Sequence, residues 1–376
     1  MRETADIVVI GGGTTGCAIA WHLARGGLRV RLVERTRIGA GSSGASPGIV
    51  RQYYSDSALA TLACEGLNVY RHWREVVGGD CGYRRTGFLT AVPISEEQAT
   101  RAHVRSLQAM GIELQWIPAE TMRSRYLDLA LDDLAGAVFE PDAGYCDARA
   151  TAASYAAGAR SRGAAIDIGR AVRRIVTEGG RVAGVETDRG RIDCSIVVNA
   201  AGPWAAALGK GCGAALPITA SRQCVAIVQV EEDDASEALP GMSDRCAGFY
   251  LRPDVPGHYF IGSLRADDSG PAEPDRLDCS MSDVQAARYR NRAARRFARL
   301  TDAVPVGSRV SFFDDTPDGN PLFGPDPRVQ GLFVAAGLSG HGFKFAPLFG
   351  RAVADWVSTG TVCQRMSAFK VERVLA

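Results

Sequence analysis

The strongest constraint on this chain is a glycine turn near its start. A short apolar run, Asp6–Ile10, leads into Gly11–Gly16 (GGGTTG), and an apolar helical stretch, 17–24, follows the turn. The next apolar run, 29–33, ends at Glu34. A strand, a glycine turn, a helix, a second strand and an acid in this order are typical of a dinucleotide-binding βαβ unit.

Each glycine of the turn and the acid after it have separate tasks in such a unit. Gly11 permits the tight turn, Gly13 lets the backbone approach a pyrophosphate, and Gly16 lets the helix pack closely on the sheet. The N–H groups at the helix N-terminus favour that phosphate. Glu34 is placed to accept hydrogen bonds from a ribose. The motif predicts a dinucleotide site without choosing FAD or NAD; the alternative is a tight strand–helix turn that binds nothing.

Size and composition limit the class of protein. A chain of 376 residues favours two interleaved domains, and 43 basic against 42 acidic residues, without a basic block, give no reason to expect nucleic-acid binding. No apolar run approaches the roughly 18 residues of a membrane helix. The first strand begins by Asp6, which leaves no room for a signal peptide. We therefore expect a cytoplasmic protein whose ten scattered cysteines are reduced and bind no metal.

A second group of small residues follows Glu34. Glycine, serine and alanine crowd residues 39–48, which favours a loop that covers a cofactor over a flexible surface loop. Arg51 comes next, between apolar and aromatic neighbours. It forms either a surface ion pair or an anion clamp inside a site.

The end of the chain repeats the order of strand, glycine loop and helix. The apolar run 332–336 leads into Gly337–Phe345 (GLSGHGFKF) and then into a helical stretch. Lys344, one of three lysines in the chain, lies in this loop; the alternative is a surface lysine at a helix start. An earlier strand also ends in small residues, 200–202. Such units far apart indicate one elongated ligand, which favours FAD over NAD.

The segments between these units show simpler patterns. Helices are predicted over 56–77, 95–110, 148–162 and 282–299, the last with a solvated basic face, and antiparallel strands over 217–230 and 247–264. We read 231–240 as an acidic loop and 316–325 as a rigid turn.

Six stretches together resemble the FAD-dependent D-amino-acid oxidase-like superfamily, in its sarcosine oxidase-like and glycine oxidase-like branch. They are Val8–Gly16, Glu34–Arg35, Gly39–Gln52, Val197–Trp204, Thr316–Pro325 and Gly337–Phe345. The resemblance implies an α/β fold with an FAD-binding Rossmann-like domain of the glutathione-reductase type, built from residues 1–80, 146–215 and 315–376. It also implies an interleaved α+β substrate domain on an antiparallel sheet, from 81–145 and 216–314.

The resemblance also implies roles for single residues. At the nucleotide end, Glu34, Arg35 and Val172 would hold adenosine, and the pyrophosphate would meet Thr14, Thr15, Gly16 and Gly202. Around the flavin would lie Ser42, Ser43, Gly48, Ile49, Leu338, Ser339, Gly340, His341, Gly342, Phe343 and Lys344. Arg51 and Lys344 match a basic pair that binds the substrate carboxylate. Tyr250 is either a wall of the substrate pocket or an ordinary strand tyrosine, and His341 contacts flavin rather than acting as a base.

Five positions depart from the pattern of the relatives. Ser311 and Ala45 stand where relatives attach flavin covalently, so we expect noncovalent FAD. Phe313 stands where glycine oxidase and D-amino-acid oxidases hold a carboxylate-binding arginine, which favours the sarcosine-type pair. Phe260 and Leu264 fall where a sarcosine oxidase places a lysine for oxygen reduction and a histidine, so a dehydrogenase stays open.

The predicted reaction is FAD-dependent oxidation of the C–N bond of a secondary or cyclic amino acid to an imine, with electrons passed to O₂ or another acceptor. The substrate would be an N-methyl or proline-like amino acid. The alternatives are a primary-amine (glycine or D-amino-acid) oxidase, a hydroxy-acid oxidase, an FAD-carrying subunit of a heteromeric dehydrogenase, and an FAD-binding scaffold without turnover. Homo- and hetero-oligomers both stay open.

Overall fold

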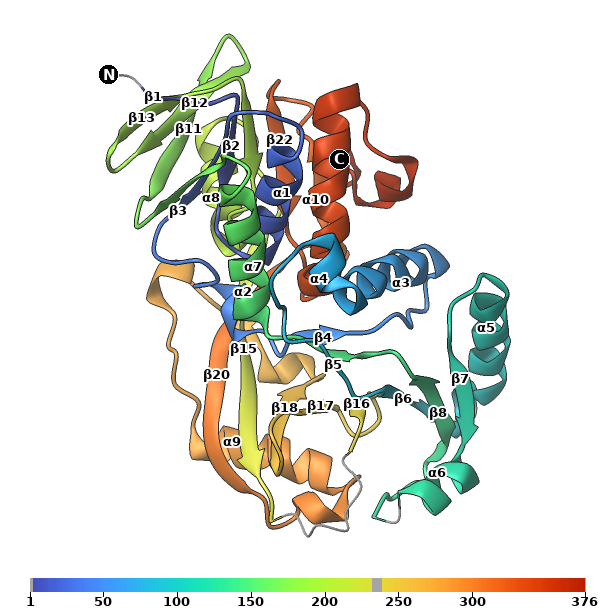
Figure 1. Cartoon of the computed structure of the whole chain (residues 1–376). Helices are drawn as coiled ribbons and strands as arrows, with labels where there is room; N and C mark the ends of the chain where they lie inside the picture. The colour runs from blue at the N-terminus through green and yellow to red at the C-terminus, as the bar shows by residue number, and fades with distance from the viewer. Residues whose placement is uncertain (1–2, 127, 232–238, 376) are drawn as a thin grey trace.

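A computed structural model describes residues 3–126, 128–231 and 239–375. The chain forms two parts, one above the other in Figure 1, and both labelled chain ends lie with the upper part. The chain passes between the parts several times. Most of the acidic loop expected at 231–240 lies outside the described residues.

A mostly parallel sheet forms the centre of the upper part. Its strands in spatial order are β10 (Ala165–Ile168), β3 (Val30–Glu34), β2 (Ile7–Ile10), β14 (Ile196–Asn199), β22 (Leu332–Ala336) and β21 (Leu322–Pro325). β21 alone in this order runs antiparallel to its neighbour. Strand β14 lies between β2 and β22 and runs parallel to both. The sheet therefore brings the first part of the chain close to its last parallel strand.

Both faces of this sheet are covered, which explains its continuous apolar strands. Ile7 and Val9 of β2 belong to the core under helices α1 (Thr14–Ala24), α7 (Ala148–Arg160) and α10 (Gly342–Thr359). Val8 and Ile10 point the other way, into a core shared with a second sheet. That sheet has the order β1 (Glu3–Thr4), β13 (Gly190–Asp193), β12 (Arg181–Thr187) and β11 (Val172–Glu178).

The lower part is built on a large mixed sheet with a core of its own. The strand order is β19 (Gly270–Pro271), β15 (Thr219–Gln229), β18 (His258–Ser263), β17 (Phe249–Pro253), β16 (Gly241–Asp244), β6 (Phe88–Pro93), β8 (Leu134–Glu140) and β7 (Gln115–Pro118), and β20 (Val304–Asp315) also pairs with β15. Helix α9 (Asp283–Ala294) packs on it through Tyr289. α5 (Glu97–Ala109) and α6 (Ala119–Arg125) lie at the β7–β8 edge (Figure 1).

Short elements connect the two parts. The small sheet β4 (Ile49–Val50), β9 (Gly144–Tyr145) and β5 (Arg84–Arg85) lies at their junction in Figure 1. The remaining helices are α2 (Ser42–Ala45), α3 (Ser57–Arg71), α4 (Trp73–Val76) and α8 (Ala205–Gly211). Short 3₁₀ helices cover Ile94–Glu96, Gly202–Trp204, Ala266–Asp268, Pro274–Arg276, Ala298–Leu300, Gln364–Phe369 and Val371–Val374. In the described ranges, no helix is both long and apolar enough to cross a bilayer.

The α/β fold expected from the sequence is confirmed, with several corrections. The helix expected over 56–77 is divided at His72 into α3 and α4. The turn expected over 316–325 ends in strand β21. The sequence reading missed β20, because Pro305 and Gly307 at its start and two aspartates at its end interrupt an alternating pattern.

The helix expected over 282–299 is α9, which ends at Ala294, and the arginines of this stretch are not simply solvated. Arg288 and Arg292 both contact the buried carboxylate of Asp268. Arg296, whose side chain is 4% exposed, pairs with Asp133 and Asp244. These ion pairs attach the helix to the sheet, which a pattern of charges along one segment does not reveal.

Candidate active site

The glycine turn leaves no room for a side chain at two of its glycines. Gly11 has a φ of +104°, and a Cβ atom there would lie 2.5 Å from the Ala200 carbonyl oxygen. A Cβ atom on Gly16 would lie 2.0 Å from the Gly11 carbonyl oxygen. The first turn of α1 therefore packs directly against the loop after β2. Its N-terminal N–H groups face a cavity lined by Thr15 and Gly16.

Glu34 is fixed beside this turn. Its Oε2 atom accepts a hydrogen bond from the Gly12 N–H at 2.7 Å, and its Oε1 atom accepts one from the Thr36 N–H at 2.8 Å. The side chain is buried at the end of β3. The Oε1 atom also accepts a hydrogen bond from the Thr36 hydroxyl at 3.1 Å, so Oε2 is the oxygen with a lone pair left for a ligand hydroxyl in the cavity.

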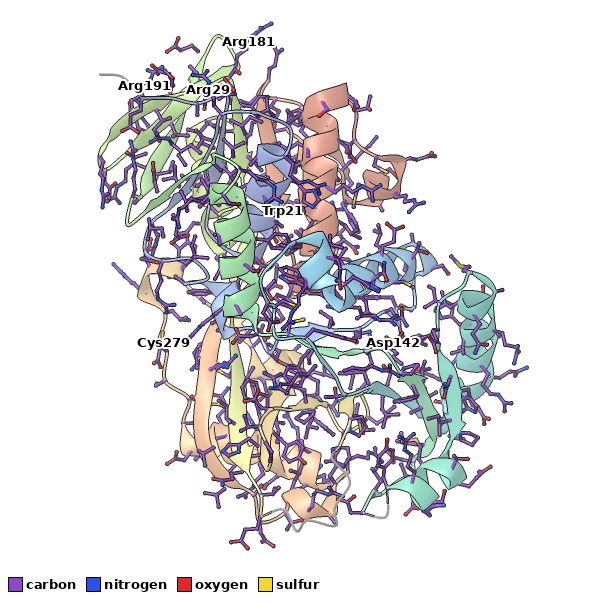
Figure 2. All side chains as sticks on the ribbon, in the orientation of Figure 1. Trp21, Arg29, Asp142, Arg181, Arg191 and Cys279 are labelled. Carbon is purple, nitrogen blue, oxygen red and sulfur yellow. The ribbon has the colours of Figure 1, made fainter. Side chains whose placement is uncertain are left out.

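Residues from both parts of the chain meet in the wall of this cavity. The Arg35 guanidinium lies 4.3 Å from the centre of the Trp204 ring and 2.8 Å from an Asp275 carboxylate oxygen. The Trp204 Nε1–H donates to the same oxygen at 2.9 Å. Asp275 belongs to the segment that carries Cys279, which Figure 2 labels near the junction of the parts. Val172 and Gly202 line the same cavity.

Two adjoining cavities form one elongated site. The larger, of about 750 Å³, follows the glycine turn, and the smaller, of about 300 Å³, reaches Lys344. They share eight lining residues: Thr15, Ser42, Ser43, Ala45, Ser311, Phe312, Asp314 and Leu338. The two sequence-distant glycine loops therefore border one space, as their repetition indicated.

Most residues predicted for the site line these cavities. The larger cavity contains Gly11, Gly13, Thr15, Gly16, Glu34, Arg35, Ser42, Ser43, Val172, Gly202 and Leu338 in its wall, and the smaller contains Thr14, Ile49, Arg51, Tyr250, Ser339, Gly340, His341, Gly342, Phe343 and Lys344. Gly48 lines neither cavity. It has a φ of +68°, and a Cβ atom there would lie 2.1 Å from the Cys146 carbonyl oxygen. Glycine at position 48 therefore allows the chain before β4 to pack closely against the chain after β9.

Buried polar atoms without partners indicate what kind of ligand the site fits. Among the described residues, the Thr14 Oγ1, Ser42 Oγ and Asp314 Oδ2 atoms are buried and have no hydrogen-bond partner. All three residues line the cavities. Burial raises the pKa of Asp314 to about 6. Because buried polar groups are almost always satisfied, these atoms fit a long polar ligand with a phosphate end, as FAD is.

Two cations lie at the other end of the elongated site. Arg51 follows β4, and Lys344 lies in the first turn of α10 with 7% of its surface exposed. The Arg51 guanidinium carbon and the Lys344 Nζ atom lie 4.8 Å and 5.8 Å from the centre of the Tyr54 ring. Burial and the Arg51 charge lower the pKa of Lys344 to about 7. Both cations line the smaller cavity, so the arrangement is suited to binding an anion there.

His341 and Tyr250 complete the wall of the smaller cavity. The His341 Nδ1 atom is 3.0 Å from the Tyr54 hydroxyl, and burial with the Lys344 charge lowers the histidine pKa to about 3. His341 is therefore neutral and is not placed as a base near pH 7. Tyr250 lies over Gly262, where a Cβ atom would lie 2.0 Å from the ring, and burial raises the tyrosine pKa.

The sequence reading missed three charged groups at this site. Glu140 is fully buried behind Arg51, and Asp314 and Arg309 line the smaller cavity. Glu140 ends an apolar strand and Arg309 alternates with Ser311, so both were visible in the sequence, but neither pattern shows what the residue faces.

The positions that depart from the relatives lie around the same cavity. Ser311, Ala45, Phe313 and Leu264 line it, whereas Phe260 is 1% exposed. The guanidinium carbons of Arg252 and Arg309 lie 3.9 and 4.5 Å from the centre of the Phe260 ring. Within the described residues, no group of three or more His, Cys, Asp or Glu side chains is arranged to hold a metal ion.

Comparison with known proteins gives relatives along the whole chain. It is 27% identical to the 4-methylaminobutanoate oxidase (formaldehyde-forming) of Paenarthrobacter nicotinovorans and 29% identical to human mitochondrial sarcosine dehydrogenase, over 97% and 99% of this chain. It spans only 45% and 42% of these longer proteins. Glycine oxidase of Geobacillus kaustophilus is 28% identical, over 99% of this chain and 98% of the relative.

Structure comparison and a family model agree with these relatives. The L-proline dehydrogenase of P. horikoshii superposes with a TM-score of 0.90 over 99% of this chain and 98% of that one; at 24% identity this shows the fold alone. The model of the DAO family, described as FAD dependent oxidoreductase, matches residues 6–356. The chain therefore belongs to the DAO family of FAD-dependent oxidoreductases.

Proposed function

We propose that this chain oxidises the C–N bond of a secondary or cyclic amino acid, such as an N-methyl or proline-like amino acid, to an imine. The observation that carries the proposal is that Arg51 and Lys344 both line the smaller cavity and both approach the ring of Tyr54. Two relatives over nearly the whole chain are by name a methylaminobutanoate oxidase and a sarcosine dehydrogenase, both of which act on N-methyl amino acids.

The chain's own residues hold the cofactor in this proposal. The α1 N-terminus and Thr15 bind the pyrophosphate, Glu34 binds the ribose, and the loop around Ser42 meets the flavin. FAD is held without a covalent bond, because serine and alanine at 311 and 45 offer no thiol or imidazole. Bound FAD supplies the two-electron acceptor for a hydride that leaves the carbon next to nitrogen.

The remaining contribution of the chain is placement and charge. Arg51 and Lys344 bind the substrate carboxylate, so the amine lies between this pair and the flavin. Because the pair compensates the substrate carboxylate, that carboxylate no longer stabilises the ammonium form, which leaves the nitrogen lone pair available to form the C=N bond. Neutral His341 holds the Tyr54 hydroxyl and keeps the wall in place. Water hydrolyses the released imine in solution.

A primary-amine oxidase is the second candidate, because the glycine oxidase relative matches this chain over its full length. Phe313 on the cavity wall opposes it, since that side chain offers no cation to a carboxylate. A subunit role is the third candidate, since the chain spans less than half of the two longer relatives.

Anaerobic bleaching of the flavin by a panel of amino acids tests the proposal. The panel holds sarcosine, L- and D-proline, glycine, D-alanine and a hydroxy acid. We expect bleaching by secondary amines only, and re-admitted air then shows whether O₂ is the acceptor. Bleaching by glycine or D-alanine alone contradicts the proposal in favour of the second candidate. No bleaching by any compound, with FAD bound, contradicts it for the isolated chain.

Single variants distinguish a loss of carboxylate binding by Arg51 and Lys344 from a general loss of structure. Arg51→Ala and Lys344→Ala are expected to raise KM for an amino acid more than tenfold while FAD stays bound. Lys370→Ala, at an exposed lysine far along the chain, is the matched control and should change nothing. Unchanged KM in both cavity variants would show that the pair does not bind the carboxylate.

A further inference from the structure

A third charged residue, Glu140, lies next to the segment that carries Arg51. Glu140, the last residue of β8, has none of its surface exposed. Its Oε2 atom accepts hydrogen bonds from the backbone N–H groups of Gln52 and Tyr53, the latter at 2.9 Å. These are the two residues directly after Arg51, so this carboxylate fixes the backbone that carries the arginine into the cavity.

The second oxygen of the Glu140 carboxylate is not used in this way. Its Oε1 atom is buried and has no hydrogen-bond partner among the described residues. The charge of Glu140 reaches the basic pair. Burial raises the pKa of Glu140, while the charges of Arg51 and Lys344 lower it. Glu140 in turn raises the pKa of Lys344 against the effect of burial.

The charge of this end of the site can therefore be counted. Below the pKa of Lys344, about 7, Arg51 and Lys344 carry two positive charges and Glu140 carries one negative charge beside them. Neutral His341 and Tyr54, whose pKa burial raises to about 12, add nothing. Two other charged groups line the cavity away from the pair: Arg309 interacts with Arg252 and Asp254, and Asp314 also lines the larger cavity. One positive charge remains, and one substrate carboxylate compensates it. A second carboxylate on the substrate would be repelled by the buried Glu140 carboxylate, because the protein interior screens charge poorly.

We propose that Glu140 makes this site selective for amino acids with a single carboxylate, by cancelling one of the two positive charges that face the substrate. The inference rests on the proposed function, because it takes Arg51 and Lys344 as the carboxylate-binding pair. Glu140 acts through these two residues and is a positioning and specificity-determining residue that does not itself touch the substrate.

The variant Glu140→Gln tests this, because the amide oxygen keeps the acceptor for Gln52 and Tyr53 while the charge is removed. Binding of redox-inert acids is followed by the change in the visible spectrum of the bound flavin. Propionate serves as the monocarboxylate, and malonate and succinate serve as dicarboxylates. We expect the wild-type protein to bind propionate at least tenfold more tightly than either dicarboxylate, and Glu140→Gln to reduce that ratio about tenfold.

Two further readouts separate charge from structure. In Glu140→Gln the pH midpoint of propionate binding should move down, because the charge that raises the pKa of Lys344 is gone. KM for dicarboxylic amino acids should fall while kcat for monocarboxylic ones is kept; a purely structural role would lower kcat and FAD content for both. Glu113→Gln, at an exposed glutamate, is the matched control and should leave the ratio unchanged.

The outcomes distinguish this inference from the proposed function. Loss of propionate binding in Arg51→Ala, together with an unchanged ratio in Glu140→Gln, overturns the role of Glu140 alone. Propionate binding that survives both Arg51→Ala and Lys344→Ala overturns the basic pair and with it this inference. If Glu140→Gln does not fold, the wild-type protein still decides, since equal affinities for propionate and malonate overturn the charge count.

Discussion

Raising the pH should release a bound carboxylate from this protein well below the range in which a surface lysine titrates. The pKa of Lys344 is about 7, against an ordinary value of 10.5, because the ammonium group is buried and lies near Arg51. Its charged form is present below pH 7 and disappears above it. Asp314 in the same cavity has a pKa of about 6 and is largely ionised above pH 7, so a change in affinity between pH 7 and 9 reports Lys344.

The size of the effect follows from the fraction of protein that is competent to bind. If only the ammonium form binds, the apparent Kd is the intrinsic Kd divided by that fraction. With a pKa of about 7, the apparent Kd is about twice the intrinsic value at pH 7, about 11 times at pH 8 and about 100 times at pH 9. The slope above pH 8 is then about 1.4 kcal/mol of binding free energy per pH unit.

Propionate binding, measured by the flavin spectrum from pH 7 to 9, checks this without interference from a substrate amine. Lys344→Arg is the matched variant: its guanidinium stays charged, so its Kd should be constant over this range even if weaker overall. Lys344→Met should bind weakly and show the same Kd at every pH. A wild-type Kd that is constant from pH 7 to 9 would refute the reasoning, and so would an equally steep rise in Lys344→Arg.

Three other predictions concern the cofactor end and the pH dependence of stability. Thr14→Val and Ser42→Ala should each weaken FAD binding about fivefold, the effect of one lost hydrogen bond of about 1 kcal/mol, without lowering the Tm of the FAD-free protein, since both hydroxyls lack protein partners; an unchanged FAD Kd would contradict this. Gly16→Ala should abolish FAD binding and lower the Tm, because its Cβ would lie 2.0 Å from a backbone oxygen, whereas Gly211→Ala, with open space around it, should do neither. The pKa of Asp314 is about 6, against 3.8 ordinarily, so the folded protein keeps this proton at a higher pH than the unfolded chain. The contribution of Asp314 to the free energy of unfolding therefore falls as the pH rises from about 4 to 6. The free energy of unfolding of Asp314→Asn should not show this fall, and an identical pH profile for variant and wild-type protein would contradict the prediction.

Local patterns were enough to predict the parts of the site that are local in sequence. The glycine turn before α1, Glu34 after β3 and Lys344 at the start of α10 each follow a strand that the sequence marks clearly. The carboxyl ends of parallel strands lie at one edge of a sheet. Once the strand order is known, these residues are therefore predicted to lie close together. The order itself came from the family resemblance, because no spacing within one chain fixes it.

The residues that the sequence did not reveal are connected by long-range pairing. Glu140 meets the backbone after Arg51 across 88 positions of the chain. Arg309 faces the cavity because β20 pairs with β15 in a register that places Arg309 opposite Val225. Such a register depends on which strands lie side by side, and the broken alternation of β20 concealed even its existence. Charges behind a site are therefore harder to predict than the groups that line it.

The position of β22 beside β14 has a consequence for how the protein is made. The glycine turn begins at residue 11, but the sheet behind it and the helix layer over that sheet are completed by β22 and α10. These two elements end at Ala336 and Thr359. A growing chain on the ribosome exposes the apolar faces of β14 and α1 until these last segments emerge. Flavin capture by this site thus has to wait until α10 has emerged, and a chain that terminates before β22 has a glycine turn whose sheet and helix layer are incomplete.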